Sequence, residues 1–307
     1  MKLAELQLKV AESRRLGPWH AIQHLSNNGG CVDLLYKGKL WSLHFFVHKG
    51  EARIEYIPKE PQKTSWAPMD MLVPSRDQNY IELRRLHKTS DRSGTETVLL
   101  AIALAKALNA ESIVLADNAS IECLHDKNNT SMSLAWLRML QGKPTYYEKF
   151  GFKHDDAARL KACRSIVAKQ GRMPLRQVVT NLAAYLRILK QVQANPANYN
   201  MRDGNHDGWH KEWISDVAAL KFRATTQIRD GKALLAALTK GANKTKSFGS
   251  QVDYLSKSKK CKYVDQLFSG WFLYLDVRDI KTGKVYRALP TTEFRSLYPM
   301  DMSKTLT

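Results

Sequence analysis

Alternating apolar and polar residues in the first third of the chain predict β-strands. Residues 31–50 and 51–60 are rich in β-branched and aromatic side chains, and Lys-Gly pairs interrupt them where hairpin turns are needed. Tyr80–Leu86 shows the same alternation over seven residues. A helix is expected before these strands, ending near Arg15 because a Gly-Pro pair follows. The pattern therefore predicts a helix followed by an antiparallel meander.

The pattern changes after a polar turn. Residues 97–110 are almost wholly apolar over a helical length, and residues 112–117 form a short apolar run typical of a buried strand. A second helix is expected over about residues 131–141. Strands and helices in this order predict the α/β (α+β) fold class, with a mixed sheet and flanking helices.

Helical spacing dominates the second half. Apolar residues recur at i, i+3, i+4 and i+7 in residues 157–170, 175–193, 211–228 and 231–240. The chain then returns to an extended pattern in residues 271–289, where a Thr-Gly turn separates two strands. This half is predicted to be mainly helical and to end in a β-hairpin.

Two domain arrangements fit this order of elements. In the first, residues 1–154 form an α/β domain and residues 155–307 form a basic, mainly helical domain. In the second, residues 155–265 are a helical insertion, and residues 266–307 return to complete the N-terminal sheet. The second arrangement predicts that deleting the last segment would unfold the N-terminal half.

Charge separates the two halves of the 307 residues. Residues 1–150 contain 20 Lys and Arg against 16 Asp and Glu, a balance of +4, whereas residues 151–307 contain 28 against 13, a balance of +15. A hydrophobic content of 44% is enough for a buried core. The longest nearly uncharged run, residues 98–110, is too short to span a bilayer, so no membrane association is expected. The basic half should instead attract an anionic partner.

The cysteines and histidines show no strong metal pattern. The four cysteines are far apart and form no Cys-x-x-Cys pair, which predicts free thiols in a reducing compartment, cytoplasmic or nuclear. No apolar leader is expected at the N-terminus. No bound metal is expected, although Asp203, His206, Asp207 and His210 could form a site if they are not simply a polar loop.

Residues 80–152 resemble the central part of the GCN5-related N-acetyltransferase (GNAT) superfamily. The resemblance rests on a strand, a polar turn and an apolar helix, followed by a second strand and helix. It ends in a Tyr-x-x-x-Gly-Phe sequence, here Tyr147 to Phe152. The segments "SGTETVLL", "LADNASIEC" and "YYEKFGF" also resemble divergent members from large DNA viruses. The resemblance implies a GNAT-like mixed sheet.

The same resemblance implies acetyl-CoA as co-substrate and an amine, on a small molecule or a protein, as acceptor. Pantetheine would lie along the first of two splayed strands, and pyrophosphate would lie at the start of the apolar helix. The residues that would bind acyl-CoA are Leu83, Arg84, Arg85, Leu86, Arg92, Ser93, Gly94, Thr95 and Glu96. Glu82, or a bound water, would act as base, and Tyr147 would protonate the leaving thiolate.

The phosphate turn departs from the superfamily pattern of Gln/Arg-x-x-Gly-x-Gly/Ala. Only Gly94 matches it, while Asp91 and Glu96 put carboxylates where a pyrophosphate would bind. Ser93 and Glu96 also have the spacing of a helix capping box, which would use the same backbone donors. Glu82 could equally lie on a solvated strand face, and Tyr147 could equally be a core residue.

Cations at helical spacing in the basic half predict contacts to phosphates. The candidate nucleic-acid-binding residues are Arg164, Lys169, Arg172, Arg176, Arg187 and Lys190. No base-reading motif accompanies them, so any contact to nucleic acid would be directed to its backbone. The alternative is a helical bundle with a solvated basic face.

Two functions therefore remain open. The first is acyl transfer from acyl-CoA to an amine by direct attack. The second is a catalytically inactive GNAT-like scaffold that binds nucleic acid, another polyanion or a larger assembly through its basic half.

Overall fold

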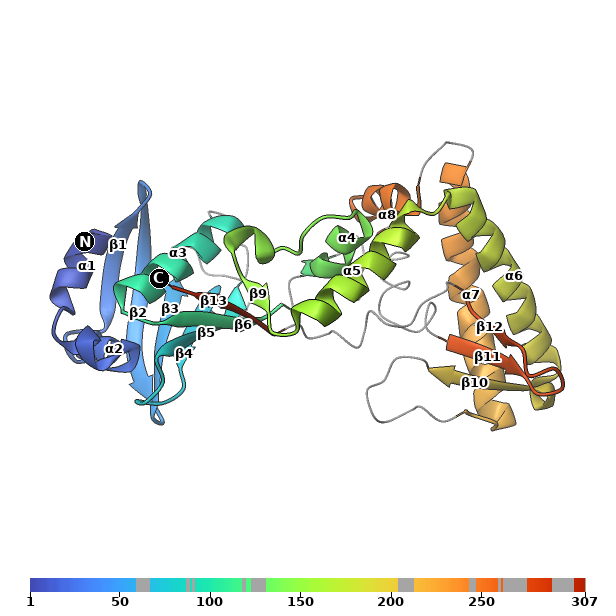
Figure 1. Cartoon of the computed structure of the whole chain (residues 1–307), viewed down its shortest axis with the longest axis horizontal. Helices are drawn as coiled ribbons and strands as arrows, with labels where there is room; N and C mark the ends of the chain where they lie inside the picture. The colour runs from blue at the N-terminus through green and yellow to red at the C-terminus, as the bar shows by residue number, and fades with distance from the viewer. Residues whose placement is uncertain are drawn as a thin grey trace. The chain divides into compact units, whose positions relative to one another are not determined.

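The computed structural model divides the chain into two units (Figure 1). The first unit comprises Met1–Asp117, Phe150–Asp155 and Met300–Thr307, and the second comprises Asn118–Lys149 and Asp156–Pro299. The residues that the structure describes are 1–58, 67–86, 89, 92–117, 120–122, 131–203, 213–242, 247–258, 261, 275–288 and 301–306.

A mixed sheet forms the first unit and has eight strands among the described residues. In order across the sheet they are β1 (Cys31–Tyr36), β2 (Lys39–His48), β3 (Glu51–Ile57), β4 (Met69–Val73), β5 (Tyr80–Leu86), β6 (Ser112–Ala116), β13 (Asp301–Thr305) and β9 (Lys153–His154). Neighbouring strands are antiparallel except for β5 and β6, which are parallel.

The Lys-Gly pairs make the turns of the meander. Lys37 and Gly38 join β1 to β2 with φ of 48° and 74°, and Lys49 and Gly50 join β2 to β3 with φ of 51° and 83°. Two successive residues with positive φ suit a two-residue hairpin, because the turn then has the same twist as its strands. The predicted antiparallel meander is confirmed.

Helices cover one face of this sheet (Figure 1). α2 (Pro18–Asn27) packs on β2 and β3, while α3 (Gly94–Ala107) packs on β5 and β6 and contacts α1 (Leu3–Lys9). A short 3-10 helix, η1 (Ser13–Leu16), joins α1 to α2. Every second strand residue is buried beneath the helices, which explains the alternating sequence pattern.

Helices dominate the second unit. Those in its described part are α4 (Leu134–Leu140), α5 (Ala157–Arg172), α6 (Leu175–Ala194), α7 (Val217–Ala242) and α8 (Phe248–Ser256), with the short η2 (Glu148–Phe150) and η3 (Pro196–Asn198). A small sheet has the order β10 (Tyr199–Asp203), β11 (Leu275–Asp279) and β12 (Val285–Tyr286), and β7 (Ser120–Glu122) pairs with β8 (Ser131–Ser133). None of the helices described in either unit is long and apolar enough to cross a membrane.

Two glycines allow α4, α5 and α8 to approach closely. A Cβ atom added to Gly171 on α5 would lie 1.8 Å from the carbonyl oxygen of Leu140 at the end of α4. A Cβ added to Gly249 on α8 would lie 2.9 Å from the same oxygen. Neither glycine has a positive φ, so the close approach, and not backbone conformation, is what requires them.

The structure refines the predicted elements in two ways. The helical segments expected at residues 211–228 and 231–240 are joined in the single helix α7, which begins only at Val217. Gly231 lies within this helix, which is tolerated because a glycine costs a helix only about 1 kcal/mol. The predicted final hairpin is β11 and β12, and it belongs to the small sheet of the second unit.

The chain returns to the first unit twice, at Phe150–Asp155 and again at Met300–Thr307. β13 inserts between β6 and β9, pairing Leu115 with Met302 on one side and Met302 with His154 on the other. The α/β fold class is thus correct. The predicted boundary at residues 154 and 155 lies next to the passage between units, while residues 118–149 belong with the second unit.

Candidate functional site

The parallel strands β5 and β6 separate after a short paired stretch. They pair at Tyr80 with Ser112, Ile81 with Ile113 and Glu82 with Val114. β5 then runs on for four more residues, and no further pairing with β6 occurs among the described residues. The remaining part of β6 pairs with β13 on its other side. We call the place beyond Glu82, where this pairing ends, the opening between β5 and β6.

A β-bulge lies at the start of this opening. Asp70 pairs with Arg85 and Met71 pairs with Leu83, so Arg84 is an extra residue on β5. A bulge bends its strand and increases the local twist. Leu83–Leu86, all predicted acyl-CoA contacts, are the residues of β5 beyond its pairing with β6, and the bulge lies among them.

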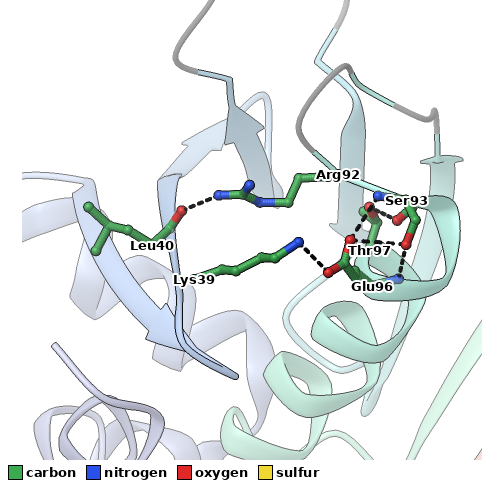
Figure 2. A network of polar contacts seen from close by, with 6 residues as sticks. All are labelled: Lys39, Leu40, Arg92, Ser93, Glu96 and Thr97. Atoms are coloured by element: carbon green, nitrogen blue, oxygen red, sulfur yellow. Dashed lines mark hydrogen bonds and ion pairs between the residues drawn. The ribbon is translucent and has the colours of Figure 1, made fainter.

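A capping box closes the start of α3, next in sequence after β5 (Figure 2). The backbone N–H of Glu96 donates to the Ser93 hydroxyl at 3.2 Å, and the backbone N–H of Ser93 donates to the Glu96 carboxylate at 2.9 Å. The Ser93 hydroxyl also donates to that carboxylate at 3.0 Å. The capping box expected from the Ser-x-x-Glu spacing is present.

Two cations from the same unit approach this capping box (Figure 2). Lys39 Nζ lies 2.5 Å from Glu96 Oε1, and Arg92 donates to the carbonyl oxygen of Leu40 at 2.7 Å. The Arg92 guanidinium also stacks over the Trp41 ring, 4.7 Å from its centroid. Hydrogen bonds from Lys39 and Ser93 lower the pKa of Glu96 to about 2, so this carboxylate is ionised at neutral pH.

The start of α3 is therefore already occupied by an internal anion. Glu96 provides the negative charge that favours a helix N-terminus, as a phosphate otherwise could. An external phosphate could bind there only if Glu96 moved or if the phosphate met Lys39 and Arg92 from outside. The predicted contacts Arg92, Ser93 and Glu96 lie together, but they already bind one another or their neighbours in the first unit.

Glu82 lies on a charged strand face. Its carboxylate is 3.4 Å from Arg84 Nε, and Arg84 also approaches Glu51 at 4.0 Å. Glu51 in turn binds Arg53 at 2.6 Å. With 36% of its side chain exposed, Glu82 is part of a surface ion-pair network beside the opening.

A second carboxylate, Asp70, lies near the bulge and was not predicted. Register places His44, Glu55, Asp70 and Arg85 directly opposite one another in a row across β2, β3, β4 and β5. Asp70 is only 4% exposed, and its Oδ1 has no hydrogen-bond partner in the described structure. The row could not be foreseen, because it depends on the register of four strands.

Tyr147 is buried in the second unit, whereas Glu82 belongs to the first. Its ring lies edge-on to Tyr146, and the neighbouring Glu148 accepts hydrogen bonds from the Thr145 backbone N–H and from Arg164. Burial raises the pKa of Glu148, but these hydrogen bonds outweigh it and leave that pKa lowered.

The remaining part of the Tyr-x-x-x-Gly-Phe motif lies in the first unit. Gly151 has a φ of 86°, a conformation that favours glycine, and it ends the short helix before β9. Phe152 is buried. The chain therefore crosses from the second unit to the first within the motif.

The predicted nucleic-acid contacts are exposed with one exception. Lys169, Arg172, Arg176, Arg187 and Lys190 lie on the solvent side of α5 and α6. Arg164 instead forms an ion pair with Glu148 and is only partly exposed. Its role as a nucleic-acid contact stays a prediction, and the ion pair with Glu148 could not be foreseen from spacing, because Glu148 lies 16 residues before it and outside α5.

The thiols and the candidate metal site differ in what the structure describes. Cys31 and Cys163 form no disulfide, but Cys261 is disulfide-bonded, so the prediction of free thiols is wrong at that position. Asp203 ends β10, whereas His206, Asp207 and His210 lie outside the described residues. Within the described residues no group of three or more His, Cys, Asp or Glu side chains could hold a metal ion.

Arginines cluster around one buried carboxylate in the small sheet. Asp276 is 1% exposed and accepts hydrogen bonds from Arg202 at 2.7 Å and from Arg287 at 2.6 Å and 3.1 Å. The guanidinium groups of Arg202 and Arg278 both stack on Trp213, at 4.6 Å and 4.3 Å from its ring. Nothing in the spacing of these residues along the chain predicts that they meet.

Comparison with known proteins adds no relative: no family description, no curated protein and no solved structure matches this chain.

Proposed function

We propose that this chain transfers an acyl group from acyl-CoA to an amine at the opening between β5 and β6. The observation that carries the proposal is the parallel pair that separates beyond Glu82, with a bulge on one strand and a helix start directly after it. The strand order also agrees with the resemblance, because β9 and β13 follow the Gly-Phe motif and complete the sheet.

The residues present fit the two ends of acyl-CoA unequally. The backbone of Leu83–Leu86, which is not paired with β6, suits the amides of pantetheine as an added strand. At the phosphate end, Lys39 and Arg92 supply cations, but Glu96 opposes them. Binding of the pyrophosphate thus requires that Glu96 release the Ser93 backbone N–H.

The proposed reaction balances in bonds and in protons. The amine nitrogen attacks the thioester carbonyl carbon, a C–N bond forms, the C–S bond breaks, and the proton lost by nitrogen is matched by one gained by the thiolate. Glu82 or a water would accept the first proton, with Asp70, on the same sheet face, as the buried alternative. The thiolate would take its proton from water, because Tyr147, the acid that the resemblance implies, belongs to the other unit. Acyl-CoA itself supplies the activated carbonyl.

Calorimetric titration with acetyl-CoA and with CoA tests the proposal. We expect micromolar binding that is lost in Gly94→Trp, where a bulky side chain enters the start of α3. The control is Lys106→Trp at the other end of the same helix, which should bind as the wild type does. Absence of binding at millimolar ligand would contradict the proposal.

Activity, once an acceptor amine is found, separates the two carboxylates. If Glu82 is the base, Glu82→Gln should lower the rate by about 10²-fold or more and Asp70→Asn should not, since general base catalysis typically contributes that much. The reverse result would assign the role to Asp70. Unchanged rates in both variants would leave general base catalysis by these two carboxylates without support.

A second candidate function is binding of nucleic acid by the second unit. The observation that favours it is the charge of α5, α6 and α7, which together contain 13 Lys and Arg but a single acidic residue, Asp230. Salt-dependent binding of a nonspecific duplex tests it. This function needs no catalytic residue and would also suit an inactive scaffold.

A further inference from the structure

The exposed cations of α6 and α7 recur at the same spacings on both helices. Arg176 and Arg187 on α6 are eleven residues apart, and Lys190 follows three residues later. On α7, Lys221 and Lys232 are also eleven residues apart, with Arg229 three residues before the second. Eleven residues make about three helical turns, so the cations of each helix lie on one side of it.

The two rows face the same side of the helix pair. α6 and α7 pack against each other and run antiparallel (Figure 1). Their apolar residues, such as Leu186 and Leu234, are buried, while the cations named above are exposed. We call the exposed set the α6/α7 face; it consists of Arg176, Arg187, Lys190, Lys221, Arg229, Lys232 and Lys240.

A side-chain contact between the helices shows which residues of α6 lie beside which residues of α7. Gln193 donates to the Thr225 hydroxyl at 2.9 Å. Counting three residues back along α6 and three or four forward along α7 brings Lys190 level with Arg229. Counting six back and seven forward brings Arg187 level with Lys232. Like charges therefore stand side by side across the helix pair.

Little within the chain neutralises this face. Arg229 forms an ion pair with Asp230 at 3.0 Å, and no other member forms an ion pair in the described part of the chain. Adjacent like charges oppose folding by a few tenths of a kcal/mol for each pair. A polyanion laid along the face would remove this repulsion, which is the charge complementarity of a docking surface.

We propose that the α6/α7 face binds the phosphate backbone of double-stranded nucleic acid, a proposal that rests on the second candidate function above. Two packed helices lie about 8–10 Å apart, so two rows of cations can meet phosphates on both edges of a groove about 6–12 Å wide. Thr180 and Ala183, on the same side of α6 as its cations, are small. A membrane-binding helix would need a continuous row of large apolar side chains, whereas those exposed on α7 are Val217, at its first turn, and Phe222.

The test measures fluorescence anisotropy of a labelled duplex of about 20 base pairs at about 50 mM and about 200 mM salt. A matched single strand and vesicles of phosphatidylserine and phosphatidylcholine are run alongside. The face variant carries Arg176→Gln, Arg187→Gln, Lys190→Gln and Lys232→Gln. The control variant removes the same charge from exposed residues of α5, with Arg159→Gln, Lys161→Gln, Lys169→Gln and Arg172→Gln.

We expect the face variant to bind duplex at least about tenfold more weakly at the lower salt, and the control variant to lose less than about threefold. The slope of log K against log salt should also flatten by about 3–4 in the face variant, since each phosphate contact contributes about 0.9.

Each other result overturns a distinct claim. Equal losses in the two variants would mean that binding is diffuse and that the face is assigned wrongly. Equal or tighter binding of the single strand would exclude a duplex, and tighter binding of vesicles would make the partner a membrane. No binding of any probe by the wild type would remove the second candidate function itself.

Discussion

The charges at the start of α3 are neutralised within the chain, whereas most of those on the α6/α7 face are not. At the start of α3, Glu96, Lys39 and Ser93 satisfy one another within hydrogen-bond distance, and the helix N-terminus is capped by its own chain. On the α6/α7 face, Arg187 and Lys190 stand near Lys232 and Arg229 with one carboxylate among them. The first arrangement limits what can bind from outside, whereas the second leaves a charge for a partner to neutralise.

The two regions should also differ in how their affinity for a ligand depends on individual residues. A ligand at the start of α3 has to replace defined hydrogen bonds, so small changes in the capping box should change its affinity sharply. A polymer on the α6/α7 face meets cations on flexible side chains, and its affinity should depend on their number and on salt.

Removing Asp276 should have the largest effect on stability. This carboxylate is the internal counter-ion of the small sheet, and Asp276→Ala leaves Arg202 and Arg287 without it. We expect a loss of about 3–5 kcal/mol in the free energy of unfolding, measured by urea denaturation. The control, Lys257→Ala, breaks an exposed pair with Asp253 and should cost less than about 1 kcal/mol. Equal costs would mean that Asp276 is not a buried counter-ion.

Gly171→Ala should be next in size. The added methyl would lie 1.8 Å from the Leu140 carbonyl oxygen, so α4 and α5 must move apart, at a cost of about 2–3 kcal/mol in the free energy of unfolding. Gly142→Ala is the control, because nothing lies within 4 Å of its added methyl although its φ is 72°. It should cost about 1 kcal/mol through backbone strain alone. If Gly142→Ala lost more stability than Gly171→Ala, backbone strain would outweigh the clash between α4 and α5.

Glu96→Gln should have a small effect on stability that depends on pH. Gln retains the capping box but loses the ionic contact with Lys39, for a cost below about 1 kcal/mol near neutral pH. The folded-state pKa of Glu96 is lowered from 4.5 to about 2, so its contribution is complete above pH 4.5 and disappears as the pH falls to about 2. The difference between variant and wild type, measured by thermal unfolding, should shrink over that interval.

Glu96→Gln should also change the affinity for CoA at the start of α3. Because Glu96 opposes a pyrophosphate, Glu96→Gln should bind CoA several-fold more tightly if the proposed function holds. Lys39→Gln is the matched control, since it removes the opposite charge from the same contact and should bind more weakly. A uniform loss in both would mean that the cap serves the helix alone.

Neutralising part of the α6/α7 face should give the smallest change, and in the stabilising direction. Lys190→Gln with Lys232→Gln removes repulsion between neighbouring cations, so the free energy of unfolding should rise by about 0.5 kcal/mol at low salt. High salt should remove the gain, because exposed charges are then screened. Thermal unfolding at two salt concentrations measures it, and a loss of stability would mean that these cations have partners that keep them in place.

Local sequence patterns predicted the strands, turns and helix cap well. They could not predict the ion pairs formed by residues far apart in the sequence. The alternation of β1 to β3, the Lys-Gly turns and the Ser93–Glu96 capping box all depend on residues close in sequence. Lys39 could not be assigned to Glu96, because a hairpin and several intervening strands bring it there. The pairing of Arg164 with Glu148 was missed for the same reason.

The candidate site was predicted only in its local parts. Arg92, Ser93 and Glu96 lie together as the sequence suggested, but the bulge at Arg84 and the buried Asp70 depend on how β4 pairs with β5. The last strand, β13, could not be predicted from its own residues either. The apolar spacing of residues 301–305 is too short to predict a strand, and its pairing with both β6 and β9 makes it one.

The sequence by itself determined the strands and helices, the cap of α3 and the excess of positive charge in the second half, because these follow from spacing, side-chain type and neighbours within a few residues. The tertiary structure alone decided that β5 and β6 part beyond Glu82, that β13 closes the sheet, and which charges meet. Those outcomes require distant segments to come together, and the entropy of closing such loops is repaid only by contacts that no single segment contains.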